Sequence, residues 1–384
     1  MTDTPILQWD EAGQKYHARW HSESGVPAPQ KITVADDRMN ADAAYRLACE
    51  GHGLLWRGDF QNARMLLQAL ARRIDRKPRK AAAKVPASPA EAFHLNRQSQ
   101  ARRVRLLGML LIPFEPNYRI PLRRAPEMQQ ACREAYGDAL QNEAFVISLR
   151  ELQGVIGAHE WRKKGVEIPA LGTRIHPHYG VYSPIRGEYV KLVADAPLPS
   201  TASAFDIGTG TGVLAAVLAR RGMQRIVATD QDERALVCAR DNMRRLGYES
   251  RVEIIHADLF PPGKAALVVC NPPWLPVRPV SALDHAVYDP DSRMLRGFLD
   301  GLAAHLEPEG EGWLILSNLA ENLGLREKDA LASMLDNAGL MVVGRHDAKP
   351  VHAKASDPDD PLHAARAAEV TTLWRLKPKA SSIN

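Results

Sequence analysis

Cysteine is scarce and scattered in this chain of 384 residues. The four cysteines stand at positions 49, 132, 238 and 270, and none belongs to a CxxC pair or to a cluster with histidine. This spacing argues against a disulfide framework and against a zinc site. We therefore expect small buried cysteine side chains, a reducing cytoplasmic location and no bound metal.

The sequence also lacks a long hydrophobic run. No stretch of about 18 apolar residues occurs, so no membrane-spanning helix is expected. The first 20 residues lack the basic start and apolar centre of a signal peptide. Hydrophobic residues make up 45% of the chain and charged residues 25%, which is typical of a globular protein. The length suits two domains.

Positive charge is unevenly distributed along the chain. Residues 1–200 contain 29 Lys and Arg against 21 Asp and Glu, although the net charge of the whole chain is only +5. The excess is concentrated between residues 71 and 105, in the basic run at 72–84 and in Arg102, Arg103 and Arg105. A localised basic region suggests RNA as a partner, with a solvated arginine-rich surface as the alternative.

Residues 1–165 are expected to form a mostly helical, basic domain that recognises the substrate. Asp59 is a candidate N-cap for a helix with one apolar face. The residues of that face are Phe60, Ala63, Leu66, Leu67 and Leu70. Residues 75–92 are rich in Lys, Arg, Ala and Pro, which indicates a flexible linker.

Residues 166–384 follow a different pattern, in which apolar strands alternate with helices. This alternation predicts an α/β domain with a parallel sheet and helices on both faces, closed by two further strands near the end of the chain. In such sheets ligands bind at the carboxyl ends of the strands. The candidate site residues should therefore follow the strands directly.

A glycine-rich loop, "FDIGTGTGVLA", follows the first predicted strand. Its glycines, at 208, 210 and 212, allow a tight turn and close approach of a ligand to the backbone. The G-x-G-x-G spacing differs from the G-x-G-x-x-G fingerprint of dinucleotide sites, which disfavours a dehydrogenase. An acidic residue, Asp206, precedes the first glycine by two positions. These details favour S-adenosylmethionine (SAM), whose methionine end is cationic.

Two more acidic residues end the next two predicted strands. Asp230 closes "RIVATD", where a carboxylate is placed to accept hydrogen bonds from the two hydroxyls of a ribose. Asp258 lies in "HADLF", where it is placed to meet the amino group of adenine. A loop aspartate that caps a helix is the structural alternative for each residue taken singly.

The fourth predicted strand ends in "NPPW", Asn271 to Trp274, and the prolines stop the strand. An amide or aromatic amino nitrogen is a poor nucleophile, because its lone pair is delocalised. The side-chain carbonyl of Asn271 and the backbone carbonyl of Pro272 can accept hydrogen bonds from such an NH2 group and offset the charge that grows on it. Pro272 and Pro273 make the turn rigid, and Trp274 offers a flat face to a planar acceptor.

These motifs resemble those of the class I SAM-dependent methyltransferases over residues 175–375. The resemblance implies a seven-stranded sheet with a reversed last strand. It also implies that SAM contacts the glycine loop with Thr209, the acidic residues, Leu259 and Asn271. Upstream, "GVYSPIRGEYVKLV" is similar to the segment that these enzymes fold over the cofactor, with Tyr182 and Glu188 at matching positions. These residues alternatively only open a helix.

Asn271 to Trp274 resemble the (N/D/S)PP(Y/F/W) motif of amino-methyltransferases. Two substrate classes from the translation machinery stay open: a glutamine side chain of a protein, modified at N5, and an amino group of an RNA base. The resemblance extends to protein-glutamine methyltransferases and to RNA enzymes of the small methyltransferase domain group. A DNA adenine-N6 methyltransferase and a module that binds SAM or RNA without turnover are further alternatives.

Overall fold

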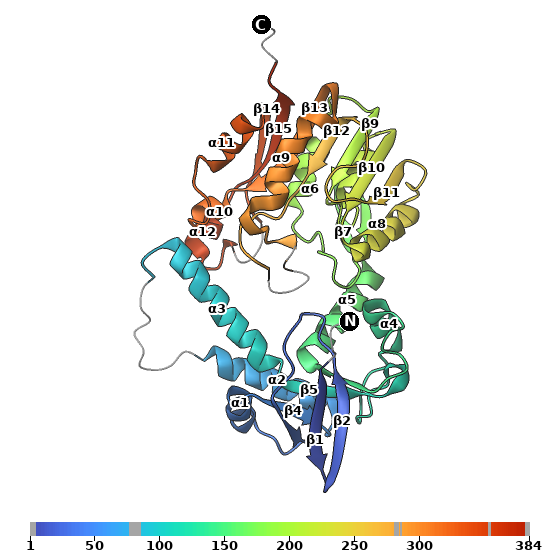
Figure 1. Cartoon of the computed structure of the whole chain (residues 1–384), viewed down its shortest axis with the longest axis vertical. Helices are drawn as coiled ribbons and strands as arrows, with labels where there is room; N and C mark the ends of the chain where they lie inside the picture. The colour runs from blue at the N-terminus through green and yellow to red at the C-terminus, as the bar shows by residue number, and fades with distance from the viewer. Residues whose placement is uncertain (1–4, 77–85, 280–283, 285, 352–354, 381–384) are drawn as a thin grey trace. The chain divides into compact units, whose positions relative to one another are not determined.

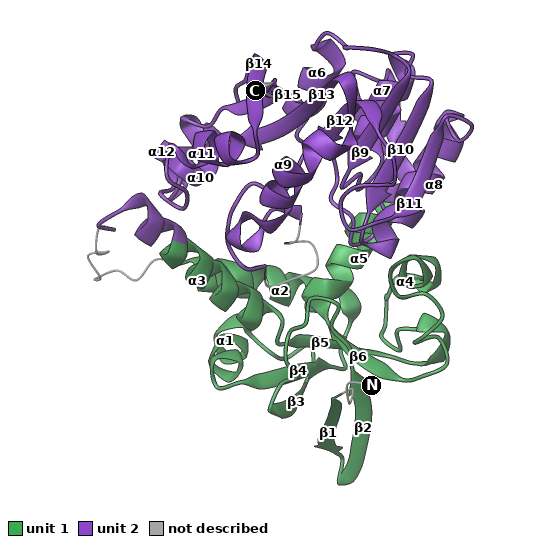
Figure 2. Ribbon diagram, turned by 45° about the horizontal axis from the view of Figure 1, so that its top comes forward, with its two compact units in different colours: residues 1–85, 94–160 green, residues 86–93, 161–384 purple. Residues whose placement is uncertain are grey.

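The structure is a computed structural model that describes residues 5–76, 86–279, 284, 286–351 and 355–380. The chain divides into two compact units (Figure 2). The first comprises residues 1–85 and 94–160, and the second comprises residues 86–93 and 161–384. Each unit has its own sheet.

The second unit is built on a seven-stranded sheet, which confirms the predicted α/β fold. The strand order is β11-β10-β9-β12-β13-β15-β14. β15 is antiparallel to both of its neighbours, and the other neighbouring pairs are parallel, so the last strand is reversed as expected. The strands are β9 (Ser203–Ile207), β10 (Arg225–Asp230), β11 (Val252–His256), β12 (Ala265–Cys270), β13 (Leu306–Ser317), β14 (Leu340–Ala348) and β15 (Thr371–Pro378).

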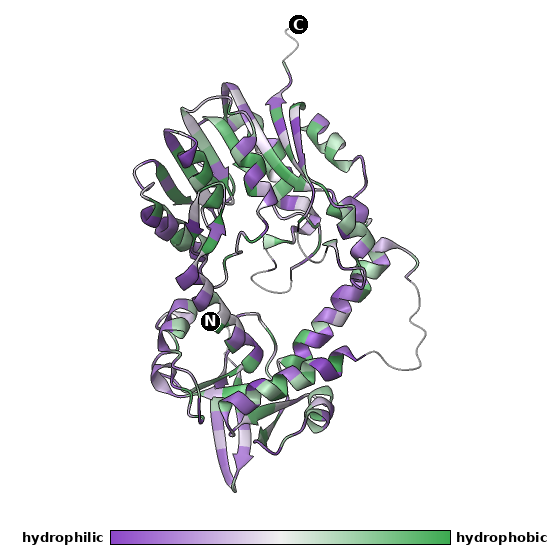
Figure 3. Cartoon of the chain, turned by 180° about the vertical axis from the view of Figure 1, so that it is seen from behind, coloured by the Kyte–Doolittle hydropathy of each residue, from purple (hydrophilic) through white to green (hydrophobic). Residues whose placement is uncertain are grey.

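Helices cover both faces of this sheet (Figure 1). One apolar cluster contains residues of the two helices α6 and α7, and another contains residues of α9 and α11. Coloured by hydropathy, the strands of this sheet show many green, hydrophobic segments (Figure 3). The helices are α6 (Glu188–Asp195), α7 (Val213–Arg220), α8 (Glu233–Leu246), α9 (Arg293–His305), α10 (Leu319–Asn322), α11 (Ala330–Asn337) and α12 (His363–Ala367).

Smaller elements complete the second unit. A two-stranded antiparallel sheet precedes α6, and a short 3-10 helix precedes α9. The two strands are β7 (Val166–Ile168) and β8 (Thr173–Ile175), and the 3-10 helix is η3 (Pro290–Ser292).

The first unit is not mostly helical, which corrects the prediction. It contains a six-stranded mixed sheet with the order β1-β2-β6-β5-β4-β3. Strands β4, β5 and β6 are short apolar runs buried along almost their whole length, and periodicity does not distinguish such runs from buried helix. The strands are β1 (Ile6–Glu11), β2 (Gln14–Trp20), β3 (Lys31–Ala35), β4 (His52–Trp56), β5 (Leu110–Phe114) and β6 (Phe145–Ser148).

The predicted helix after Asp59 is confirmed. Asp59 caps it, since a side-chain oxygen accepts a hydrogen bond from the backbone N–H of Gln61 at 2.9 Å. All five residues of the predicted apolar face are buried. The helices of this part of the chain are α1 (Ala41–Cys49), α2 (Phe60–Asp75), α3 (Pro89–Leu107), η1 (Pro116–Tyr118), α4 (Gln129–Tyr136) and α5 (Leu149–Lys164).

The predicted linker at 75–92 is only partly a connection. Asp75 still belongs to α2, and α3 begins at Pro89, so residues 89–92 are helical. Proline suits the first turn of a helix, because its missing N–H would have no partner there. The core of the predicted linker, 77–85, and with it most of the basic run, lies outside the described residues.

Within the part of the chain that the structure describes, we find no helix with the length and apolar character needed to cross a membrane.

Candidate functional site

The candidate site lies along one line of paired residues across the seven-stranded sheet. Cys270 of β12 pairs with Ile207 of β9, and Ile207 pairs with Thr229 of β10. Thr229 in turn pairs with Ile255 of β11. The glycine loop, Asp230, the Asp258 segment and the NPPW motif therefore leave the sheet at the same carboxyl edge, as predicted.

The three glycines of the loop all have positive φ but meet different surroundings. A Cβ at Gly208 would lie 2.6 Å from Cε of Met294, and one at Gly212 would lie 2.9 Å from Cε of Met243. At Gly210, where φ is +56°, a Cβ would meet no described atom within 4 Å. The two methionine methyl groups end flexible side chains and can shift, so it is the positive φ that favours glycine at all three positions, while Gly210 also faces open space where a ligand can approach the backbone.

Asp206 is buried at the end of β9, with a relative exposure of 1%. Its Oδ2 accepts hydrogen bonds from Oγ1 of Thr209 at 2.7 Å and from the backbone N–H of Ala215 at 3.1 Å. Its Oδ1 has no hydrogen-bond partner among the described residues. Burial raises the pKa of this carboxyl to about 6, against the lowering effect of the two hydrogen bonds. An unpaired buried carboxylate oxygen is the feature expected beside a cationic ligand.

Asp230 holds the glycine loop from the neighbouring strand. Its Oδ2 accepts from the backbone N–H of Gly210 at 2.9 Å, and its Oδ1 accepts from the backbone N–H of Asp232 at 3.0 Å. Burial raises the pKa of this carboxyl as well. Because each carboxylate oxygen has two lone pairs, both oxygens can accept one more bond, such as those from ribose hydroxyls.

Asp258 and Leu259 follow β11. The Asp258 side chain is 57% exposed and pairs with Arg293 at the start of α9. Leu259 has a φ of +77°, which is uncommon for a residue with a side chain, and its carbonyl accepts from Oγ1 of Thr229 at 2.6 Å. The Asp258 side chain is thus mostly solvated, and its role at the adenine stays a prediction.

Tyr182 and Glu188 belong to the segment before the sheet, and an arginine between them connects it to the rest of the unit. Nε of Arg186 donates to Oε1 of Glu188 at 3.0 Å, and Nη2 donates to Oε1 of Glu369 at 3.0 Å. Tyr182 is 42% exposed, whereas Glu188 is buried at the first position of α6. Oε2 of Glu188 has no hydrogen-bond partner within the described chain.

The NPPW motif is held by its own side chains and by distant residues. Nε1 of Trp274 donates to Oδ1 of Asn271 at 3.0 Å. The carbonyl of Trp274 accepts from Nη2 of Arg326 at 2.9 Å. Pro272 is buried and Pro273 is half-buried, and together they make the turn between β12 and Trp274 rigid. Burial raises the pKa of the neighbouring Cys270 thiol well above its usual range.

Sequence reasoning missed Arg326 and Glu369. The side chain of Arg326 is 4% exposed and pairs with Glu321, and Glu369 also accepts from Oγ of Ser317 at 2.8 Å. Neither residue stands near a motif, so no local signal marks it. Among residues 5–76, 86–279, 284, 286–351 and 355–380 no cluster of His, Cys, Asp and Glu suited to a metal ion occurs.

The residues at this edge of the sheet fit SAM. The orphaned oxygen of Asp206 suits the cationic methionine end, and the open backbone at Gly210 allows close approach. Residues 174–338 match the family model of the methyltransferase small domain. This part of the chain is therefore similar to a methyltransferase small domain. The match and the strand order confirm the predicted class I fold and SAM as its cofactor.

Curated relatives carry two kinds of name. A release factor glutamine methyltransferase of Cereibacter sphaeroides is 31% identical over 40% of this chain and 58% of its own length. A tRNA1(Val) (adenine(37)-N6)-methyltransferase of a Shewanella species is 30% identical over 35% of this chain and 60% of its own length. The chain thus spans about three fifths of these relatives.

Solved structures align less closely. A ribosomal protein L11 methylase of Lactobacillus delbrueckii subsp. bulgaricus aligns with a TM-score of 0.37 and 15% identity, over 52% of this chain and 81% of its own. The fold assignment rests instead on the strand order and on the family match.

Proposed function

We propose that this chain transfers a methyl group from SAM to a planar NH2 nitrogen in a macromolecule of the translation machinery. One observation carries the proposal. Asn271 and Gly208 directly follow two paired residues of neighbouring strands, Cys270 and Ile207. The acceptor motif and the cofactor loop therefore adjoin at one edge of the sheet.

The cofactor supplies an electrophilic methyl group on a sulfonium when it is bound. Asp206 and Glu188 each have one carboxylate oxygen without a hydrogen-bond partner, and these two oxygens would face the cationic methionine end of SAM. Asp230, whose Oδ2 already accepts from the backbone N–H of Gly210, would accept hydrogen bonds from the ribose hydroxyls. Asp258 accepts from the adenine amino group.

The acceptor nitrogen is oriented by two carbonyls. Oδ1 of Asn271 keeps one lone pair after its bond from Trp274, and the backbone oxygen of Pro272 supplies the second acceptor. Each carbonyl would accept a hydrogen bond from one N–H of the substrate amino group. These two bonds would point the nitrogen lone pair at the methyl group and offset the positive charge that develops on nitrogen. No general base is required if the surplus proton leaves to water after transfer.

Both named substrate classes fit this geometry. A glutamine side chain and an adenine each present a planar NH2 group, and the relatives' names include one enzyme of each kind. The two carbonyl acceptors do not discriminate between them. Substrate choice then depends on parts of the chain outside the NPPW motif.

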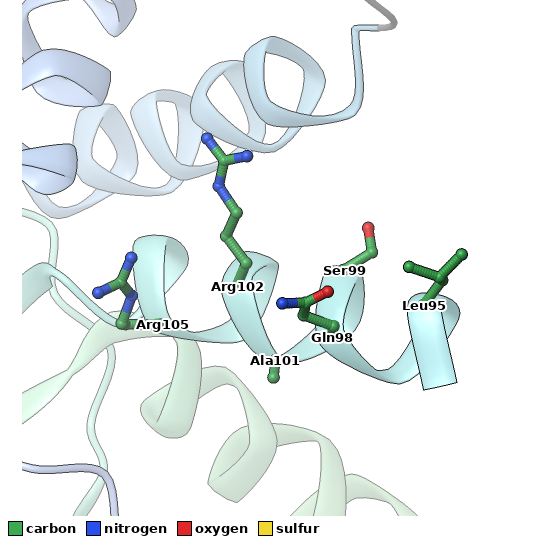
Figure 4. Close-up of a pocket in the computed structure, with 6 residues that line it drawn as sticks. All are labelled: Leu95, Gln98, Ser99, Ala101, Arg102 and Arg105. Atoms are coloured by element: carbon green, nitrogen blue, oxygen red, sulfur yellow. The ribbon is translucent and has the colours of Figure 1, made fainter. Parts of the chain in front are cut away.

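Arginines of α3 are the candidate contact for RNA. Arg102 and Arg105 line a hollow on this helix together with four other residues (Figure 4). Within the described residues neither arginine has a carboxylate partner, whereas Arg103 pairs with Asp75 at 2.8 Å. We propose that Arg102 and Arg105 contact RNA phosphates, whereas Arg103 is neutralised by its ion pair with Asp75.

The test uses purified protein, radiolabelled SAM and a lysate of cells that lack this enzyme. Labelled macromolecules are divided and digested with RNase or with protease. Label released only by protease assigns a protein substrate, and label released only by RNase assigns an RNA base. Absence of any label, with SAM bound in calorimetry, contradicts the proposed transfer and favours a binding module.

A further inference from the structure

The acceptor motif contains a hydrogen bond that its sequence pattern does not require. Nε1 of Trp274 donates to Oδ1 of Asn271 at 3.0 Å. This oxygen is the atom that the proposed function assigns to the substrate amino group. A Phe or Tyr ring at the same position has no ring N–H to donate.

The bond decides which way the Asn271 amide faces. If the amide were flipped, its NH2 group would meet the indole N–H of Trp274, and two donors would oppose each other. The carbonyl oxygen is therefore held on the side of Trp274, with its second lone pair left for another donor. An acceptor that is fixed before the substrate arrives needs no reorganisation during the reaction.

Trp274 is itself held on several sides. Its carbonyl accepts from the buried Arg326, and the guanidinium of Arg186 lies 5.2 Å from the centre of its ring. Arg186 is fixed in turn by Glu188 and Glu369. The ring also packs against both hydrophobic clusters, one on each face of the sheet. Rotation of the indole would break its contacts with Arg186 and with both clusters.

We propose that Trp274 is a positioning residue whose indole N–H orients the amide of Asn271 toward the amino group of the methyl acceptor. The inference rests on the proposed function, because only an acceptor nitrogen makes this orientation useful. It adds a hydrogen-bonding role to the flat face that the ring offers for stacking.

The hydrogen bond is tested by NMR on the full chain with 15N-labelled tryptophan, which has seven indole signals. The signal lost in Trp274→Phe identifies the Trp274 indole. In Asn271→Ala this signal should move upfield and exchange faster with solvent, because its acceptor is gone. In Asn271→Asp, which keeps an acceptor and gives it a charge, it should move downfield.

Trp313 is the internal control. Its Nε1 donates to Oε2 of Glu311 at 3.2 Å in the same sheet, so its signal should stay in place in both Asn271 variants. A Trp274 signal that moves in neither variant overturns the inference. This outcome does not depend on methyl transfer, so it differs from a failure of the proposed function.

Kinetics distinguish positioning from stacking. With radiolabelled SAM and whichever lysate fraction takes label, Trp274→Phe should lower kcat roughly 10- to 100-fold, the cost of a misplaced reacting group. The acceptor concentration at half-maximal rate and the Kd for SAM should hardly change. Trp374→Phe, a half-buried ring on β15, serves as the matched control and should keep its kcat. An unchanged kcat in Trp274→Phe, or a loss seen only at low acceptor concentration, contradicts a positioning role.

Discussion

Arg186 and Glu369 are separated by 183 positions in the sequence, yet their side chains meet at 3.0 Å. Glu369 is completely buried, and Arg186 is 22% exposed. The same guanidinium pairs with Glu188 and lies over the ring of Trp274. One arginine thus joins the segment proposed to cover the cofactor to the motif proposed to hold the acceptor.

Arg186→Met should destabilise the protein by roughly 3–5 kcal/mol, because it leaves two buried carboxylates without their shared cation. Urea denaturation measures the loss. Glu369→Gln is the matched control, since a neutral amide keeps a hydrogen-bond acceptor for Arg186 and Ser317 and should cost clearly less. Equal and small effects of both variants would show that the pair adds little to stability.

Asn271→Ala should abolish methyl transfer while largely sparing SAM affinity. The substitution removes the side-chain acceptor for the substrate amino group but no group assigned to the ribose or to the cationic end of SAM. Label transfer and calorimetry measure the two effects separately. Retained turnover would refute the proposed role of the amide.

The second unit was predictable because its signals are local. Asp206, the three glycines and Asn271 each stand at the end of an apolar strand, and the parallel sheet brings those ends to one edge. Arg326 was not predictable, because its partner Trp274 is 52 positions away and no pattern surrounds it. Glu369 is missed for the same reason.

The first unit was mispredicted because the sequence pattern of a short buried strand does not differ from that of a buried helical segment. "GLLW" follows α1 within a few residues, and "LLIPF" follows α3 in the same way. Each run is apolar on both faces, so it lacks the alternation that reveals a strand with one solvated face. The pairing partners of these strands decide their conformation, and they are remote in sequence.

The salt dependence of RNA binding should separate the three arginines of α3. Arg102→Gln with Arg105→Gln should reduce the slope of log K against log salt by about 1.4–1.8, since each phosphate contact contributes about 0.7–0.9. Arg103→Gln should leave the slope nearly unchanged, because Asp75 already neutralises that side chain. Binding titrations with total tRNA at several salt concentrations provide the measurement. Unchanged slopes in all variants would make this face of α3 a solvated surface.

Gly210→Ala tests whether the open space at the loop belongs to the cofactor. No described atom lies within 4 Å of the added Cβ, so the fold should lose only about 1–2 kcal/mol for a side chain at positive φ. SAM affinity should fall steeply, because the methyl group fills the approach to the backbone.

Gly222→Ala is the control for this comparison. Gly222 also has positive φ and an open Cβ position, but it lies at the other end of α7. Its variant should lose similar stability and keep SAM affinity. Equal SAM affinity in both variants would remove Gly210 from the site.

Asp206→Asn should stabilise the protein without ligand and weaken SAM binding. The amide oxygen keeps the bonds from Thr209 and Ala215, while the buried charge disappears. With the pKa raised from 3.8 to about 6, the ionised carboxyl costs the folded state roughly 3 kcal/mol above pH 6, at 1.36 kcal/mol per unit. Since the folded state holds this proton more tightly than the unfolded chain, the cost grows as pH rises from 3.8 to 6.

The stability gain of Asp206→Asn should therefore be largest near pH 7.5 and about half as large at pH 5, as measured by urea denaturation. Calorimetry should show the opposite trend for the ligand. SAM should bind the natural chain more weakly below pH 6, where protonation removes the charge, and the variant should bind weakly at every pH. Two results would contradict a pairing of Asp206 with the cationic end of SAM. One is a SAM affinity of the natural chain that stays constant between pH 5 and 8, and the other is an Asp206→Asn variant that is less stable than the natural chain at pH 7.5.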